Sequence, residues 1–318
     1  MAWSSRLLSL ASPALSFGTW LGPVSAFLSS VAWAVAATVY SRLSLKTNAF
    51  AVNVTRALFA FPCFLLAAVL PDGPAHAFEA FRAVPGGNLF WLSMSVLGSY
   101  ALGDALFFRS THALGVPGAL AIASTYPLWS ALAGWLLRGE RLGAAGVLGL
   151  VLVVGGVVTV IRARGGTGAG IREGRPAGVL LALATSMLWA LNAYAVSRGG
   201  TGISPPVANT IRMAVVLAVV PLACRVTMGG SAALVVPLVD ARRAAWLFVL
   251  EGFGGSMLFL IGMTRSPLAI GAALSSLAPV VSVPFVSLSG RERFSLATTL
   301  GVVVVVAGIV LLVGGRPS

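Results

Sequence analysis

Four ionisable side chains lie inside long apolar stretches of the sequence, and they are the residues best able to do chemistry. They are Arg56, Asp104, Arg212 and Glu251. Charged groups are costly in apolar surroundings and are usually kept there for a function. A carboxyl group can also alternate between a charged and a neutral form, because burial favours the neutral one. Glu251 and Asp104 are therefore the two candidates for a proton-carrying group.

Glu251 is the stronger of the two candidates. Glycines that permit close helix approach follow it, and its own stretch holds no basic residue. Asp104 lies near the end of its stretch, beside Arg109. Arg56 could form an ion pair with either acid, and the paired acid would then have a structural role. A further alternative is that neither acid carries a proton. Both Arg56 and Arg212 lie roughly 6–10 Å from a stretch end, so their long side chains could also simply reach toward water.

Polar and aromatic residues mark a candidate substrate-binding surface. Thr185, Trp189 and Asn192 are spaced i, i+4, i+7, so they share one face of a helix. Trp33 and Trp189 both lie about half-way along their stretches, away from the interfacial positions that tryptophan prefers. We expect these residues to contact a substrate. A hydrogen bond between helices would explain Asn192 equally well.

Two prolines interrupt apolar stretches near their middles. Pro127 and Pro279 each remove a backbone donor and free a carbonyl group one turn earlier. Such a site is tolerated in a membrane helix where neighbouring groups, or water in a cavity, form the missing backbone hydrogen bonds. We expect the prolines to line a cavity or to act as hinges, with a simple packing kink as the alternative. Ser124 and Ser276 lie one turn before them and could bind substrate or bond to their own helix backbone.

The remaining reactive residues do not form a catalytic or metal site. Cys63 and Cys224 lie in apolar stretches without metal-ligand spacing, and His76 and His112 lie in or beside loops. We expect no enzymatic activity, no metal and no cofactor. The acids Glu140 and Glu292 belong to the turns RGER and GRER. We expect each to cap the helix that follows its turn and to pair with adjacent arginines.

The elements that carry these residues must be membrane helices. The chain has 318 residues, of which 58% are hydrophobic and 9% charged, with a mean hydropathy of +0.97. A soluble domain would have about a quarter charged residues. The net charge of +13 comes from arginines scattered singly between apolar runs, which indicates interfacial anchors and not a nucleic-acid surface. We therefore expect the lipid bilayer as a partner and no nucleic acid.

Ten apolar runs are each long enough to cross about 30 Å of hydrocarbon. They cover residues 21–41, 49–70, 89–108, 113–137, 144–162, 178–197, 205–224, 245–263, 268–289 and 296–313. Gly- and Pro-rich turns separate them, including PDGPAH at 71–76 and PGG at 85–87.

The sequence repeats itself. Residues 117–157 match 269–309 at an offset of 152, which places Ser124 on Ser276 and Pro127 on Pro279. Further upstream the offset is 156: SSVAWAVAATVYSR matches TSMLWALNAYAVSR, and NVTR at 53–56 matches NTIR at 209–212. Each repeat therefore holds five spans, an odd number, so the second copy enters the bilayer from the opposite side. Inverted repeats are typical of alternating access around a midplane site.

The RGER turn after a proline-bearing span, followed by glycines at 149 and 156 in the next span, resembles the EamA family of the drug/metabolite transporter superfamily. The resemblance implies ten spans in two five-span repeats. It implies a central cavity lined by spans one, three, four, six, eight and nine, with five and ten at the periphery. It also implies export of amino acids, other metabolites or drugs, often coupled to protons.

The predicted organisation has five parts: an N-terminal tail at 1–20, a first repeat at 21–162, a linker at 163–177, a second repeat at 178–313 and a C-terminal tail at 314–318. We predict a multi-pass inner-membrane secondary transporter for a small-molecule substrate, since the chain has no ATP-binding P-loop. The alternatives are an uptake or antiport carrier of the sugar-phosphate or nucleotide-sugar kind, with Arg56 and Arg212 as its cationic site, and a membrane-embedded enzyme. Substrate identity, transport direction and oligomeric state stay open.

Orientation also stays open. Twelve Lys or Arg residues fall on the side of the odd-numbered loops and seven on the side of the termini. The positive-inside rule would put both termini outside. Members of the family are usually drawn with both termini in the cytoplasm.

Overall fold

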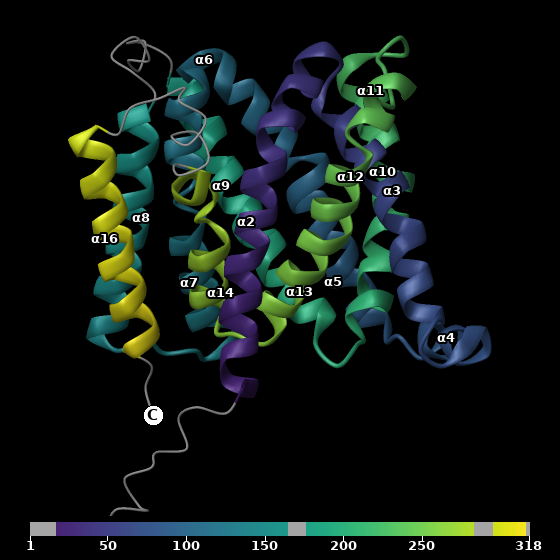
Figure 1. Cartoon of the computed structure of the whole chain (residues 1–318), viewed down its shortest axis with the longest axis horizontal. Coiled ribbons are helices and arrows are strands. Elements are labelled where there is room, and N and C mark those ends of the chain that lie inside the picture. The colour runs from purple at the N-terminus through teal and green to yellow at the C-terminus, as the bar shows by residue number, and fades with distance from the viewer. Residues whose placement is uncertain (1–16, 165–175, 283–294, 316–318) are drawn as a thin grey trace, which may run out of the picture.

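A computed structural model describes residues 17–164, 176–282 and 295–315 of the chain. Within these ranges the ordered elements are helices, and they stand side by side as one bundle (Figure 1). Among the described residues, nine helical segments are long and apolar enough to cross a membrane, and a shorter apolar one at Leu268–Ser282 completes the predicted ten. The chain is an all-α integral membrane protein.

The first repeat supplies five spans. Their elements are α2 (Phe17–Lys46), α3 (Ala49–Val69), α5 (Gly86–Val96), the π-helical turn η1 (Leu97–Ala101), α6 (Gly103–Ala123), α7 (Tyr126–Arg138) and α8 (Ala144–Arg164). A short helix, α4 (Gly73–Arg82), lies outside the bundle between α3 and α5. The turn predicted at 71–76 is therefore partly wrong, because Pro74 begins a helix there in place of extending a loop.

The second repeat supplies the other five. Its elements are α9 (Pro176–Gly200), α10 (Pro205–Met228), α11 (Leu238–Arg243), α12 (Ala245–Leu247), the π-helical turn η2 (Phe248–Gly255), α13 (Ser256–Thr264), α14 (Leu268–Ser275) and α16 (Leu296–Gly314). The helical residues up to Ser282 continue the span that α14 begins.

The two repeats are inverted, as predicted. In Figure 1, α2 starts at the lower end of the bundle, whereas α9 starts at the upper end. The connection between the second and third spans carries α4 at the lower end in the first repeat, and its mate carries α11 at the upper end. The N-terminal end of α2 and the C-terminal end of α16 both lie at the lower end of the bundle. This is required for ten spans, because an even number of crossings returns the chain to the side where it began.

The connection predicted at 109–112 is wrong in detail, because α6 continues through it. Along α9, the ring of Phe107 lies 5.4 Å from that of Trp189, a Cβ at Gly178 would meet Ala113, and Thr125 lies 3.0 Å from Ser186. The contacts thus move toward the start of α9 and then away from it, so the chain does turn back between spans three and four, but in helical conformation. Residues 109–112 contain no Gly or Pro to end the helix, whereas Pro267 separates α13 from α14 at the equivalent place.

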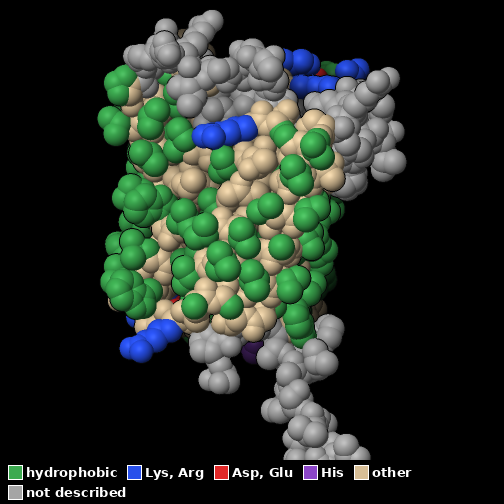
Figure 2. All heavy atoms as spheres, turned by 90° about the vertical axis from the view of Figure 1, so that its left-hand side faces the viewer, with side chains coloured by type: hydrophobic (Ala, Val, Ile, Leu, Met, Phe, Trp, Pro, Cys, Tyr) green, Lys and Arg blue, Asp and Glu red, His purple; other side chains and the backbone are tan. Residues whose placement is uncertain are grey.

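Spans five and ten form the edge of the bundle. α8 and α16 lie side by side there and pack closely on each other (Figure 1). A Cβ on Gly156 would lie 2.8 Å from the carbonyl oxygen of Gly301, so the glycines matched between the repeats are where these backbones touch. Figure 2 shows this edge covered with hydrophobic side chains, with Lys and Arg only toward its two ends. This is the surface that lipid would cover.

Candidate functional site

A cavity of about 540 Å³ lies between the two repeats, a size typical of sites for small molecules. Ten of the twelve residues singled out from the sequence line it. They are Trp33, Arg56, Asp104, Ser124, Trp189, Asn192, Arg212, Glu251, Ser276 and Pro279. Four ionisable side chains thus face one space, and they come from spans of both repeats.

Two π-helical turns face the cavity from the matched spans three and eight. η1 in span three supplies Ser99 and Tyr100, and η2 in span eight supplies Glu251 and Gly255. A π-helical turn widens the helix and alters which side chains point to one face, and such turns are frequent at functional sites. The sequence contains no signal that predicted them.

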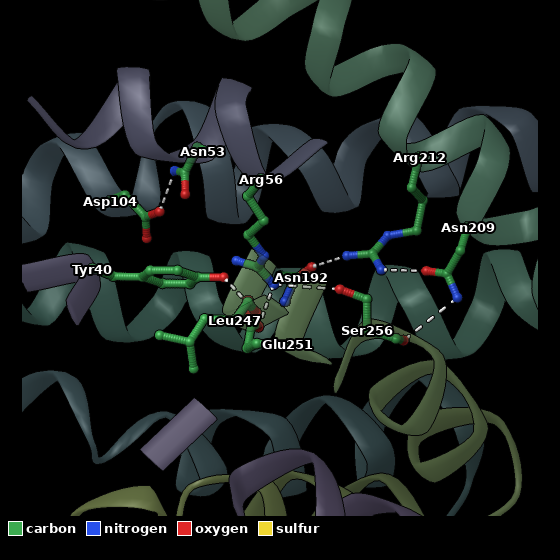
Figure 3. A network of polar contacts seen from close by, with 10 residues as sticks. All are labelled: Tyr40, Asn53, Arg56, Asp104, Asn192, Asn209, Arg212, Leu247, Glu251 and Ser256. Atoms are coloured by element: carbon green, nitrogen blue, oxygen red, sulfur yellow. Dashed lines mark hydrogen bonds and ion pairs between the residues drawn. The ribbon is translucent and has the colours of Figure 1, made fainter. Parts of the chain in front are cut away.

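Arg56 is held by the opposite repeat. Its Nη2 lies 2.6 Å from Oε1 of Glu251 and donates to Oγ of Ser256 at 3.3 Å (Figure 3). Its guanidinium carbon also lies 5.6 Å from the ring centre of Trp33 and 5.0 Å from that of Tyr100. The buried charge is therefore compensated by an acid, a hydroxyl group and two aromatic faces.

Arg212, the repeat mate of Arg56, has neutral partners. Its Nε donates to Oγ of Ser95 and its Nη1 to Oδ1 of Asn209, both at 3.0 Å. Its Nη2 lies 3.5 Å from Oδ1 of Asn192 (Figure 3). The residue is 2% exposed, and no described acid forms an ion pair with it.

Asparagines three residues before each arginine make equivalent bonds within their own repeats, from the second span to the third. Asn53 donates to the carbonyl oxygen of Tyr100 at 3.3 Å, and Asn209 donates to that of Ser256 at 3.4 Å. Both members of each pair are 156 residues from their mates, so the offset of the first two spans continues into the third. By this offset Leu260 is the mate of Asp104, and it is apolar.

Asp104 is bonded to an amide. Its Oδ2 accepts from Nδ2 of Asn53 at 2.6 Å (Figure 3). No ion pair with Arg109 forms in the part of the chain that the structure describes, although the two are close in sequence. The two acids of the cavity therefore differ, because Glu251 is paired with a cation and Asp104 with a neutral group.

Comparison with known proteins agrees with this architecture. The model of the EamA-like transporter family matches residues 20–162 and 176–314, one match for each repeat. The chain belongs to the EamA-like transporter family.

The individual proteins that resemble this chain are distant in sequence. A protein from Archaeoglobus fulgidus named only as an uncharacterized transporter is 25% identical over 287 residues, which cover 89% of this chain and 94% of the relative. A solved crystal structure with 21% identity has a TM-score of 0.73 and covers 94% of this chain and 97% of its own. That likeness supports the fold alone.

The EamA resemblance placed the cavity between spans one, three, four, six, eight and nine. Spans two and seven also contribute, because Arg56 on α3 and Arg212 on α10 reach into it. Span five adds Ile161 from the end of α8. The charged groups of the cavity thus come partly from helices outside the expected set.

Both proline-bearing spans break instead of bending. α6 ends at Ala123, and Pro127 lies in the first turn of α7, where its missing N–H leaves no partner unsatisfied. In the second repeat α14 ends at Ser275, four residues before Pro279. Ser276 follows the break and donates to the carbonyl oxygen of Ala273 at 2.8 Å, so its hydroxyl group bonds locally.

Two of the expected site residues lie outside the cavity lining. Pro127 is buried in α7, and Thr185 is fully buried with its hydroxyl group bonded to the carbonyl oxygen of Leu181 at 2.9 Å. Trp189 and Asn192, on the same helix, do line the cavity.

Glu140 caps a different helix from the one we predicted. Its Oε2 accepts from the backbone N–H of Leu268 at 2.7 Å, at the start of α14 in the opposite repeat, and not from α8. The predicted pairing with an adjacent arginine does form, because Arg138 Nε lies 3.1 Å from Oε1. Gly139, with φ of 67°, turns the chain at this point, and Gly134 leaves room for the carboxylate. Glu292 lies outside the described residues.

Several residues of the site escaped sequence reasoning. Tyr126 bonds to the carbonyl oxygen of Ala272 at 3.0 Å and lies edge-on to Trp189, so it joins the repeats at the cavity wall. Tyr100 lies within η1 and Ser256 directly follows η2, and neither had a marker in the sequence. Asn53 and Asn209 could have been found, because each precedes its arginine by three residues in both copies of the NVTR/NTIR motif.

Proposed function

We propose that the protein is a secondary transporter of the inner membrane that exports small metabolites, such as amino acids or drug-like compounds, by alternating access. The observation that carries this proposal is the cavity between two inverted repeats, lined by residues from both. Aromatic rings and a few polar groups on its walls suit an amphipathic molecule. Movement of one repeat against the other would open the cavity to each side in turn.

A counterflow assay in proteoliposomes tests this proposal. The full chain is reconstituted, loaded with one unlabelled compound at a time, and exposed to the labelled form outside. The panel covers amino acids, nucleosides and sugar phosphates. Transient accumulation of a small metabolite supports the proposal, and no accumulation with any compound across the panel contradicts it.

The sugar-phosphate alternative is weakened by the ion pair at Arg56. A phosphate dianion needs a strongly cationic site, and Glu251 already neutralises one of the two arginines that could provide it. Asp104 on the same cavity, which forms no ion pair among the described residues, would also repel a dianion more strongly than a singly charged anion.

We further propose that export is coupled to protons through Asp104 in preference to Glu251. Pairing with Arg56 stabilises the charged form of Glu251, whereas Asp104 forms no ion pair among the described residues and accepts from the neutral Asn53 amide. Asp104→Asn should abolish substrate-dependent proton flux and leave substrate exchange intact, because exchange does not need the empty carrier to reset. Glu251→Gln, measured beside it, should retain proton flux. Normal flux in Asp104→Asn would contradict this assignment.

A further inference from the structure

Arg56 and Arg212 are repeat mates, but they differ in one partner. The 156-residue offset that relates Asn53 to Asn209 also relates Ser95 to Glu251. The contacts follow the same rule: Arg56 is paired with Glu251 and Arg212 with Ser95, each across the boundary between the repeats. The carboxylate that neutralises one arginine is therefore replaced by a hydroxyl group beside the other.

Arg212 has the capacity for a further partner. A guanidinium group has five N–H donors, and the bonds from Arg212 to Ser95, Asn209 and Asn192 use three of them. The bond to Asn192 is long at 3.5 Å, and both Arg212 and Asn192 line the cavity. A buried guanidinium group with only neutral partners is unfavourable until an anion pairs with it.

We propose that Arg212 binds a carboxylate group of the transported molecule. This carboxylate would pair with Arg212 as the carboxylate of Glu251 pairs with Arg56. This inference rests on the proposed transport function. The remaining donors of Arg212 suit the two oxygens of a carboxylate, and Asn192 and Tyr100 stand beside it on the cavity wall. Arg212 is a single positive charge without an acidic partner among the described residues, so it matches a ligand that carries a single negative charge.

Binding to the purified full-length chain tests the site without requiring transport. The probes are three acids, 3-phenylpropanoate, indole-3-acetate and hexanoate, each beside its primary amide, with phenyl phosphate as the dianion. The readout is the dissociation constant obtained from the rise in melting temperature. We expect the acids to bind at least about tenfold more tightly than their amides, because a hydrogen bond to a charged group is the stronger.

Two substitutions should remove this preference. Arg212→Gln removes the cation. Ser95→Asp supplies an internal carboxylate where the mate position has Glu251, and Ser95 itself does not line the cavity. Ser95→Asn is the matched control for size, and Arg225→Gln is the control for surface charge on the same helix. Both controls should keep the preference for acids.

The outcomes separate the two proposals. Equal binding of acids and amides by the unaltered chain, or a preference that survives in Arg212→Gln, would overturn the carboxylate site. Tighter binding of phenyl phosphate than of all three acids would overturn the single-charge assignment. If acids bind selectively but counterflow fails for every compound, the transport proposal fails while the site stands. If counterflow succeeds only with compounds that lack a carboxylate, the site fails while transport stands.

Discussion

A guanidinium group inside a membrane needs partners, and Arg56 has several, although its buried Nε has no hydrogen-bond partner in the described part of the chain. It combines an ion pair, a hydroxyl acceptor and two aromatic rings, and the residue is only 9% exposed. Removing one member of such a buried pair is costly, because the other charge is left without compensation. The Arg56–Glu251 pair also joins α3 of one repeat to η2 of the other, so its stability bears on how the repeats are held together.

Neutralising either member of this pair should lower stability. Arg56→Gln leaves Glu251 as a buried carboxylate, and Glu251→Gln leaves Arg56 with neutral partners. We expect each to cost about 3–5 kcal/mol in the free energy of unfolding, and the double variant Arg56→Gln/Glu251→Gln to cost less than the two single changes added together. Fluorescence-monitored thermal unfolding in detergent measures all three. Strict additivity would show that the two side chains do not interact.

At the scale of helices, spans five and ten depend on glycine. Gly156→Ala places a Cβ within 2.8 Å of the carbonyl oxygen of Gly301, which forces α8 and α16 apart. We expect a loss of about 1–3 kcal/mol in the free energy of unfolding. Gly155→Ala is the matched control, because a Cβ there meets nothing within 4 Å. It should be neutral or slightly stabilising. Similar losses from both variants would rule out close packing as the cause.

Another inter-repeat contact joins α7 to α14 at the lower end of the bundle. Glu140→Ala removes the acceptor for the N–H of Leu268 and the partner of Arg138, which should cost about 1 kcal/mol or more in unfolding free energy. Glu140→Gln keeps an acceptor oxygen and loses only the charge, so we expect a smaller drop in melting temperature. A Gln variant as unstable as the Ala variant would assign the effect to charge and not to the cap.

Sequence reasoning found the elements more reliably than their ends. Hydropathy and the repeat located ten spans, because a membrane helix needs a continuous apolar run and the duplication provided an internal check. The π-helical turns at Leu97–Ala101 and Phe248–Gly255 were missed, since a π turn comes from how neighbouring helices pack and has no composition of its own. Glu140 was assigned to the wrong helix for the same reason: its partner, Leu268, is remote in sequence.

Over the whole molecule, the site is the product of the duplication. Each repeat contributes one arginine and one asparagine at equivalent positions, and the inversion brings the two arginines to one cavity. Sequence identified Arg56 and Arg212 because charge in an apolar run stands out. It could not tell which acid would meet which arginine, since the Arg56–Glu251 contact spans 195 positions and opposite repeats. The two halves of the site can therefore differ in what they bind only at positions where the two repeats differ, such as Ser95 and Glu251.

The inverted arrangement makes a sharp prediction about which loops share a side of the membrane. The connection between spans two and three ends near Gly87 at the lower end of the bundle, and its mate in the second repeat begins near Gly230 at the upper end. Both glycines are exposed, and a Cβ on either meets nothing within 4 Å, so cysteine should fit at each without disturbing the fold.

We would place Gly87→Cys and Gly230→Cys separately in a chain that carries Cys63→Ala and Cys224→Ala. An impermeant thiol reagent added to intact cells should label one of the two and not the other, with both labelled after the membrane is opened. The one that reacts in intact cells also settles the orientation that the distribution of arginines left open. If both react from the same side, the two repeats are parallel, and a cavity formed by inverted halves is excluded.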